Sequence, residues 1–233
     1  MKKILIRALV CSAVMVIGAT SAMGDPTEWG GGTCDGFTYA NGQDINGFFG
    51  APFVNPAAGT FSFTNSNFNV ASQNGAPDPV DHQTDTVSFD IVCDPGLYLG
   101  QIRMAVYGQY AVSDDASVTA SGGLAVGENG SPGWPLRDWS ADMVPTPTMP
   151  ITAGNGTWDG LKTLDLSFET PLPYSELHIE MSTDVLAWSS PGGGSGSIDV
   201  NFQYCELILD VVPEPSSLAL VALGSLALLR RRR

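Results

Sequence analysis

Thr86-Val87-Ser88-Phe89-Asp90-Ile91 alternates strictly between polar and apolar residues. A period of two residues places Val87, Phe89 and Ile91 on one face of a β-strand and the polar side chains on the other. The stretch therefore predicts a strand with one buried face and one wet face.

The same alternation recurs along the body of the chain, in residues 101–106, 163–169, 176–181 and 198–204. Two shorter apolar pairs, in 61–63 and 68–70, flank Thr64-Asn65-Ser66-Asn67, which is typical of a hairpin turn. No part of the body repeats apolar residues at helical spacing. We therefore expect an all-β fold, a two-sheet antiparallel sandwich of the jelly-roll kind.

Two stretches depart from this pattern. Residues 127–157 contain five prolines and little alternation, which predicts a long irregular excursion from the sheets. The last strand, expected over Ile198–Val211, changes phase near Tyr204-Cys205-Glu206, which indicates a bulge.

The C-terminal residues form three blocks: the motif Val212, Pro213, Glu214, Pro215, Ser216; an apolar run to Leu229; and the basic cluster Arg230, Arg231, Arg232, Arg233. The prolines end the preceding structure, because they lack the amide hydrogen. The apolar run predicts a short transmembrane helix of roughly 21 Å, against a hydrocarbon core of about 30 Å. The arginines would act as the stop-transfer signal on the cytoplasmic side.

This order of blocks closely resembles the PEP-CTERM sorting signal of bacteria, over Val212–Arg233 alone. The resemblance implies export, brief retention in the membrane by the C-terminal helix, and then cutting and transfer by an exosortase-type transpeptidase. It also links such tails to bacteria that produce exopolysaccharide. It implies no biochemical activity.

The N-terminus fits the same route. Lys2, Lys3 and Arg7 precede an apolar run, and Ala22-Met23-Gly24 is a small-x-small cleavage site before Asp25. This is typical of a signal peptide that is read by the export translocon. We therefore expect a signal peptide over 1–24, a β-sandwich domain over 25–211 and the sorting signal over 212–233, with the product in the cell envelope or outside the cell.

The exported body is strongly acidic. Seven of the ten basic residues and one of the 24 acidic residues lie in the two end segments, so the body carries 23 acids and 3 bases. This excludes electrostatic binding of nucleic acid and disfavours anionic lipid. Residues 41–47 resemble a fragment of a calcium loop without its first Asp and last Glu, so calcium is the one cofactor left open and otherwise none is expected.

Three cysteines remain after export: Cys34, Cys93 and Cys205. In an oxidising compartment, one disulfide and one free thiol are the simplest arrangement. Cys93 and Cys205 both share phase with apolar neighbours and are the preferred pair, while Cys34 could instead pair with either one. With no Cys-x-x-Cys spacing and only two histidines, we expect no metal site.

No catalytic residue can be named from the sequence. His82 is expected in a polar loop and His178 on the wet face of a strand, and no Gly-x-Ser-x-Gly elbow is present. Glu176 and Glu180 share a strand face, but any polar face would place two acids so.

Three tryptophans, Trp134, Trp139 and Trp158, lie in or beside the proline-rich excursion. They predict either anchors that pin this segment onto the sheets or, for Trp134 and Trp139, a surface that stacks on sugar rings. The leading interpretation is a non-catalytic cell-surface or extracellular-matrix protein. A carbohydrate-binding module is the alternative, and a secreted glycoside hydrolase the third.

Overall fold

The computed structural model describes residues 25–64, 66–73, 80–128, 138–166, 176–200 and 205–213. Within these ranges the regular elements are all strands. They are β1 Thr27–Cys34, β2 Phe37–Asp44, β3 Phe53–Asn55, β4 Thr60–Phe63, β5 Asn69–Gln73, β6 Val80–Cys93, β7 Leu97–Val112, β8 Ala116–Glu128, β9 Asp138–Asp142, β10 Val144–Thr146, β11 Gly154–Asp165, β12 Glu176–Ser189, β13 Ser195–Asp199 and β14 Cys205–Pro213. The all-β prediction is confirmed. The predicted C-terminal helix lies outside the described residues, in which no helix reaches the length and apolarity needed to cross a membrane.

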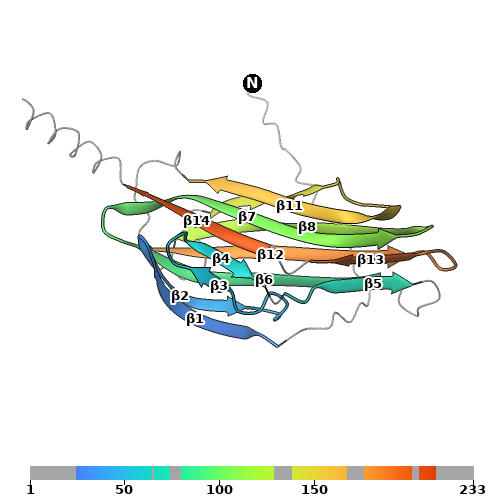
Figure 1. Ribbon diagram of the computed structural model, residues 1–233, viewed down its shortest axis with the longest axis horizontal. Helices are drawn as coiled ribbons and strands as arrows, with labels where there is room; N and C mark the ends of the chain where they lie inside the picture. Colours follow the sequence, from blue (N-terminus) through green and yellow to red (C-terminus); the bar gives the residue numbers. More distant parts are fainter. Residues whose placement is uncertain are drawn as a thin grey trace, which may run out of the picture.

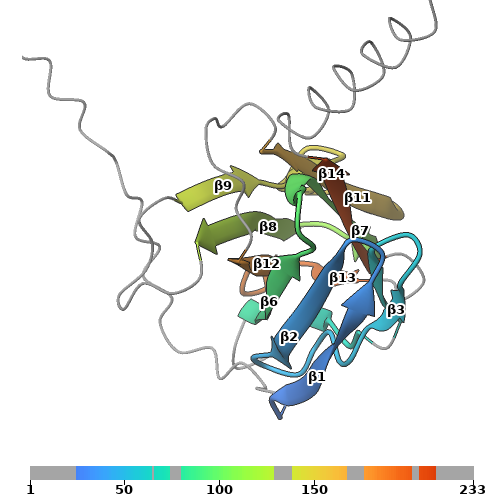
Figure 2. The ribbon, with the colours of Figure 1, turned by 90° about the vertical axis from the view of Figure 1, so that its left-hand side faces the viewer.

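The strands form two antiparallel sheets. Sheet A has the order β1-β2-β6-β12-β8-β9, and sheet B has the order β10-β11-β7-β14-β4-β3, with β13 paired to β7 and β5. The long strands run along the long axis of the molecule in Figure 1, and Figure 2 shows the strands of sheet A following one another across one layer. The expected two-sheet antiparallel sandwich is therefore confirmed.

The alternating residues fill the space between the sheets. Val87, Phe89 and Ile91 of β6 are fully buried, as are Ile102, Met104 and Val106 of β7. Four aromatic rings close one end of this core: Trp29, Tyr39, Phe61 and Phe89, with ring centroids 4.8–6.0 Å apart. The polar residues between the buried ones point outward, so each sheet has one apolar and one polar face.

The predicted hairpin around residues 64–67 is wrong. β4 pairs with β3 and β14, whereas β5 pairs with β13, so these two short strands find partners far along the chain. Between the two strands, Ser66 is buried, and the amide of Asn67 donates to the carbonyl of Phe48 at 2.6 Å. These contacts hold residues 66 and 67 against the core instead of in a hairpin turn.

The single strand expected over Ile198–Val211 is two strands. β13 ends at Asp199, and β14 begins at Cys205 and pairs with another part of β7. The irregularity in β14 lies between Asp210 and Val211. Tyr204, at the predicted bulge, lies outside the described residues. The excursion at 127–157 is also more regular than expected, because β9 continues sheet A beside β8, and β10 continues sheet B beside β11.

A glycine allows one close approach inside sheet B. Gly108 of β7 lies opposite Trp158 of β11, whose indole Nε1 donates to the carbonyl of Asp199 at 2.9 Å. A Cβ at Gly108 would collide with both the Asp199 carbonyl oxygen and the Trp158 indole. Trp158 is buried, so it anchors the sheet, as one of the two interpretations predicted.

We expect Gly108→Ala to lower the free energy of unfolding by about 1–3 kcal/mol, because the added carbon overpacks this contact. The matching fall in Tm is roughly 2–4 °C per kcal/mol for a domain of this size. Thermal unfolding followed by circular dichroism measures it, with Ala111→Ser, at an exposed position of the same strand, as the control. An unchanged Tm in the Gly108→Ala variant would contradict this packing.

Candidate functional site

The outward face of sheet A carries a groove of about 600 Å³. It crosses four strands, β6, β12, β8 and β9. Its lining consists of Thr84, Thr86, Glu180, Ser182, Asp184, Ser121, Gly122, Gly123, Leu124, Ala125, Asp142 and Met143. Seven of these twelve residues carry a hydroxyl or carboxylate group, so the groove combines hydrogen-bond acceptors with apolar surface.

The groove is hollow because the residues in register across its floor are small. Ser182 of β12 pairs with Gly123 of β8, and Gly123 pairs in turn with Asp142 of β9. Ala125 lies two residues along β8 from Gly123 and pairs with Glu180. Large side chains at these positions would fill the depression, so the sequence of small residues creates the space.

Both histidines lie on this same face, and each is bonded to an aspartate. His178 Nδ1 is 2.7 Å from Asp90 Oδ1, and its Nε2 is 3.5 Å from Glu180 Oε1. His82 Nε2 is 2.6 Å from Asp184 Oδ2. His178 is on the expected face, whereas the prediction of a loop for His82 is wrong, since the residue lies inside β6.

The sequence interpretation missed Trp188. Its side chain is 38% exposed and lies on the outward face of β12, in phase with Glu180, Ser182 and Asp184. A tryptophan in the polar phase of an alternating strand is an exposed aromatic, and extending the phase of residues 176–181 by seven more positions would have identified it.

The tryptophans that the sequence did single out take other places. Trp134 and the side chain of Trp139 lie outside the described residues, so their role as a sugar platform stays a prediction. The backbone of Trp139 belongs to β9 and pairs with Val126, a buried residue of β8.

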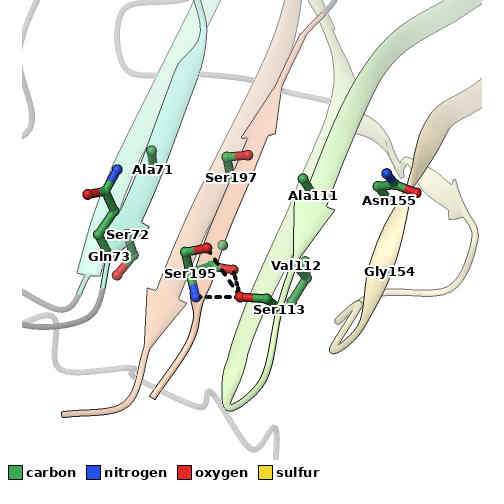
Figure 3. A pocket seen from close by; sticks show the side chains of 11 residues that line it. Ala71, Ser72, Gln73, Ala111, Val112, Ser113, Gly154, Asn155, Ser195 and Ser197 are labelled. Carbon is green, nitrogen blue, oxygen red and sulfur yellow. Dashed lines mark hydrogen bonds between the residues drawn. The ribbon is translucent and has the colours of Figure 1, made fainter. Parts of the chain in front are cut away.

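A second groove, of about 470 Å³, lies at one end of sheet B (Figure 3). Ala71, Gln73, Ala111, Asn155 and Ser197 are among its lining residues, which come from β5, β7, β11 and β13. Ser113 and Ser195 face one another there: the Ser195 amide donates to Ser113 Oγ at 3.0 Å, and the two hydroxyls are 3.2 Å apart. Among the described residues that line this groove, none has an aromatic or charged side chain.

Inside the sandwich, two carboxyl groups are buried together. Asp44 is 0% exposed, Asp85 is 1% exposed, and the two are hydrogen-bonded to each other. Backbone amides of the following segment, residues 46–50, donate to them: Gly47 and Gly50 to Asp44 at 3.1 and 2.6 Å, and Asn46 and Phe48 to Asp85 at 2.8 and 2.7 Å. The pair therefore fixes this segment against the core.

Burial raises the pKa of Asp44 to about 8, with a further contribution from the hydrogen bond and charge of Asp85. Asp44 therefore keeps its proton at neutral pH and shares it with Asp85. Backbone amides already donate to the oxygens of this pair, and calcium at residues 41–47 stays a prediction. In the described ranges, no three His, Cys, Asp or Glu side chains converge on a possible metal position.

The expected Cys93–Cys205 disulfide is not formed in the structure. Cys93 is a buried free thiol in register with Phe37, whose ring lies near Gly59. The side chain of Cys205 lies outside the described residues.

Cys34, the other cysteine considered, is also a buried free thiol. It flanks Phe37 on the side opposite Cys93, two strand spacings or about 10 Å away from it. Burial raises the pKa of Cys93 to about 11 and, together with the charge of Asp35, raises the pKa of Cys34. Both thiols are therefore protonated and unreactive in the folded domain.

The sorting segment starts inside the sheet. Val211, Val212 and Pro213 are the last residues of β14, and they pair with Leu99, Tyr98 and Leu97 of β7. Glu214 to Arg233 lie outside the described residues, as do Ala22 and Gly24 at the predicted signal cleavage site, so these roles stay predictions.

The sandwich identifies the chain only as an all-β protein. Evidence for where the protein is sent comes from the C-terminal tail. Residues 211–233 match the PEP-CTERM protein-sorting motif, so this tail is a PEP-CTERM sorting signal. Such a signal directs export and sorting, with attachment to the membrane before processing and recognition by an exosortase. No curated protein matches the chain.

Two solved structures are similar over part of the chain. One is TmCBM61 in complex with β-1,4-galactotriose, at 14% identity, covering 63% of this chain and 88% of that one, with a TM-score of 0.19. The other is the enzymatically active domain of tailspike protein 4 from bacteriophage CBA120, at 11% identity, covering 69% of this chain and 21% of that one, with a TM-score of 0.24. The chain thus spans about a fifth of the tailspike structure, and similarities this low carry no functional argument.

The buried acid pair generates a prediction about pH. The pKa of Asp44 rises from 3.8 to about 8 on folding, so the folded state binds a proton that the unfolded state releases. The contribution to stability is fully present below pH 4 and is lost as the pH rises through about 8. We expect the stability advantage of the wild type over Asp44→Asn to shrink between about pH 4.5 and about pH 8.5.

Urea unfolding at the two pH values measures this difference. Asp114→Asn, at an exposed turn, is the control and should show a difference that does not change with pH in this way. An advantage that grows with pH would show that Asp44 is ionised in the folded protein.

Proposed function

We propose that the protein is a non-catalytic surface protein of a bacterium, exported by its N-terminal signal peptide and delivered to the cell envelope or extracellular matrix by processing at its C-terminus. The observation that carries this proposal is the sorting motif at residues 211–233, which continues directly from the folded sandwich. The three segments keep separate roles: residues 1–24 and 212–233 direct the chain, and the sandwich between them acts at the destination.

The strand pairing of Val211–Pro213 supports a specific order of events. β14 pairs with β4 over Cys205–Ile208 and with β7 as far as Pro213, so the strand is held in sheet B up to its last residue. A transpeptidase that acts on the folded protein therefore has to take the chain beyond Pro213, since the preceding backbone groups are bonded to β7. The sandwich would then survive processing intact.

The acids on the outward face of β12 are widely spaced along the strand. Glu176, Glu180 and Asp184 are spaced four residues apart on the outward face of β12, or about 13 Å between Cα atoms. Paired carboxylates of glycosidases lie roughly 5–9.5 Å apart. The hydrolase interpretation thus gains no support from these neighbouring acids.

Replacing Glu214 tests the route. We expect Glu214→Ala to leave export intact while the full-length form accumulates in the membrane fraction, because the processing enzyme no longer recognises the motif. Intact mass and fractionation of protein from cell envelope and culture fluid measure this. Glu206→Ala, in β14 but upstream of the matched motif, is the control and should mature normally. Normal maturation of the Glu214 variant would overturn the proposal.

A further inference from the structure

The outward face of β12 combines a groove with an exposed aromatic ring. Glu180, Ser182 and Asp184 line the groove, and Trp188 lies farther along the same face. From Glu180 to Trp188 is eight residues, or about 26 Å of extended strand. We propose that this strip, Glu180–Trp188, is a binding site for a neutral polysaccharide chain.

The shape of the strip fits an extended polymer better than a small compact ligand. The groove is open to the surface and crosses the sheet from β6 to β9, while the face continues along β12 toward Trp188. Between the groove and Trp188, Leu186 of β12 pairs with His82 of β6 and with Thr119 of β8. The surface that joins the groove to Trp188 therefore consists of regular, paired strands. A rigid sheet positions contacts along a chain without the entropic cost of ordering loops.

The charge of the strip selects the chemistry of the ligand. Glu180, Asp184 and Asp142 place carboxylates around the floor, with His178 beside Glu180 and His82 bonded to Asp184. The described arginine and lysine side chains, Arg103 and Lys162, belong to strands of sheet B, so the acids outnumber the bases on this face. An anionic polymer would be repelled here. Sugar hydroxyls are hydrogen-bond donors, and hydrogen bonds from hydroxyl groups to carboxylates are short and strong.

Trp188 supplies the apolar half of the contact. An indole ring that is exposed on a polar sheet face offers a flat surface for the C–H faces of a sugar ring, with a polar edge beside it. The described lining of the groove at the end of sheet B has neither an aromatic ring nor a carboxylate, so that groove serves as an internal comparison.

This binding activity goes beyond the proposed sorting route and does not depend on it. The experiment uses the exported protein purified from the producing cells, in affinity electrophoresis through gels that contain a neutral β-glucan, galactan or mannan, with polygalacturonate as an anionic polymer. We expect retardation by at least one neutral polysaccharide and none by polygalacturonate.

Variants assign the site. Trp188→Ala and the groove-filling Ala125→Tyr should each weaken binding by roughly tenfold or more, while Trp188→Tyr retains most of it because an aromatic face remains. The matched controls are Phe53→Ala, which removes a 69% exposed ring from sheet B, and Ala111→Tyr, which fills the other groove. Both should bind as the wild type does.

The outcomes separate cleanly. Lack of retardation by all neutral polysaccharides, or loss of binding in Ala111→Tyr with none in Ala125→Tyr, would overturn the proposal. Circular dichroism and Tm confirm folding, and if Trp188→Ala misfolds, Ala125→Tyr and Glu180→Gln decide the result. The sorting proposal is tested only by the maturation of Glu214→Ala, so either proposal can fail without the other.

Discussion

The pairing of β12 with β6 on one side and β8 on the other determines which side chains of sheet A face outward and which face the core. Each ladder keeps one register over thirteen residue pairs. A slip of one residue in β12 would turn Glu180, Asp184 and Trp188 into the core and expose Ile179, Met181 and Val185. The burial of those apolar residues therefore fixes the chemistry of the outward face, because the two sets alternate on one strand.

The fold class results from this alternation of polar and apolar residues. The same alternation places Trp188 on the outward face of β12. Period-two patterning in β6, β7 and β12 is long and regular, which is why the sandwich was predictable from the sequence. Trp188 continues that pattern, but an aromatic residue near the end of a strand is easily taken for core. The hairpin expected at residues 64–67 failed for another reason, since β4 and β5 both have partners more than a hundred residues away.

The groove and the buried acids needed the structure. Gly123 and Asp142 meet only because β9 returns to sheet A beside β8, and no local pattern indicates that return. Asp44 and Asp85 are 41 positions apart, and each alone resembles one more surface acid in a chain with 24 acidic residues. Their pairing is a tertiary effect, in which a strand end and a strand interior bring two carboxyl groups to one set of backbone amides.

The absence of a spacer between β14 and the sorting motif has a geometric consequence. β14 is paired up to Pro213, so a mature protein that is joined to another molecule just beyond this residue has almost no slack at the junction. Its strands would then stand away from the point of attachment instead of lying beside it. The strands of sheet A run along the same axis as β14 (Figure 1). The outward face of sheet A would therefore be exposed along the side of the molecule, at a distance from the attachment point set by the length of the strands.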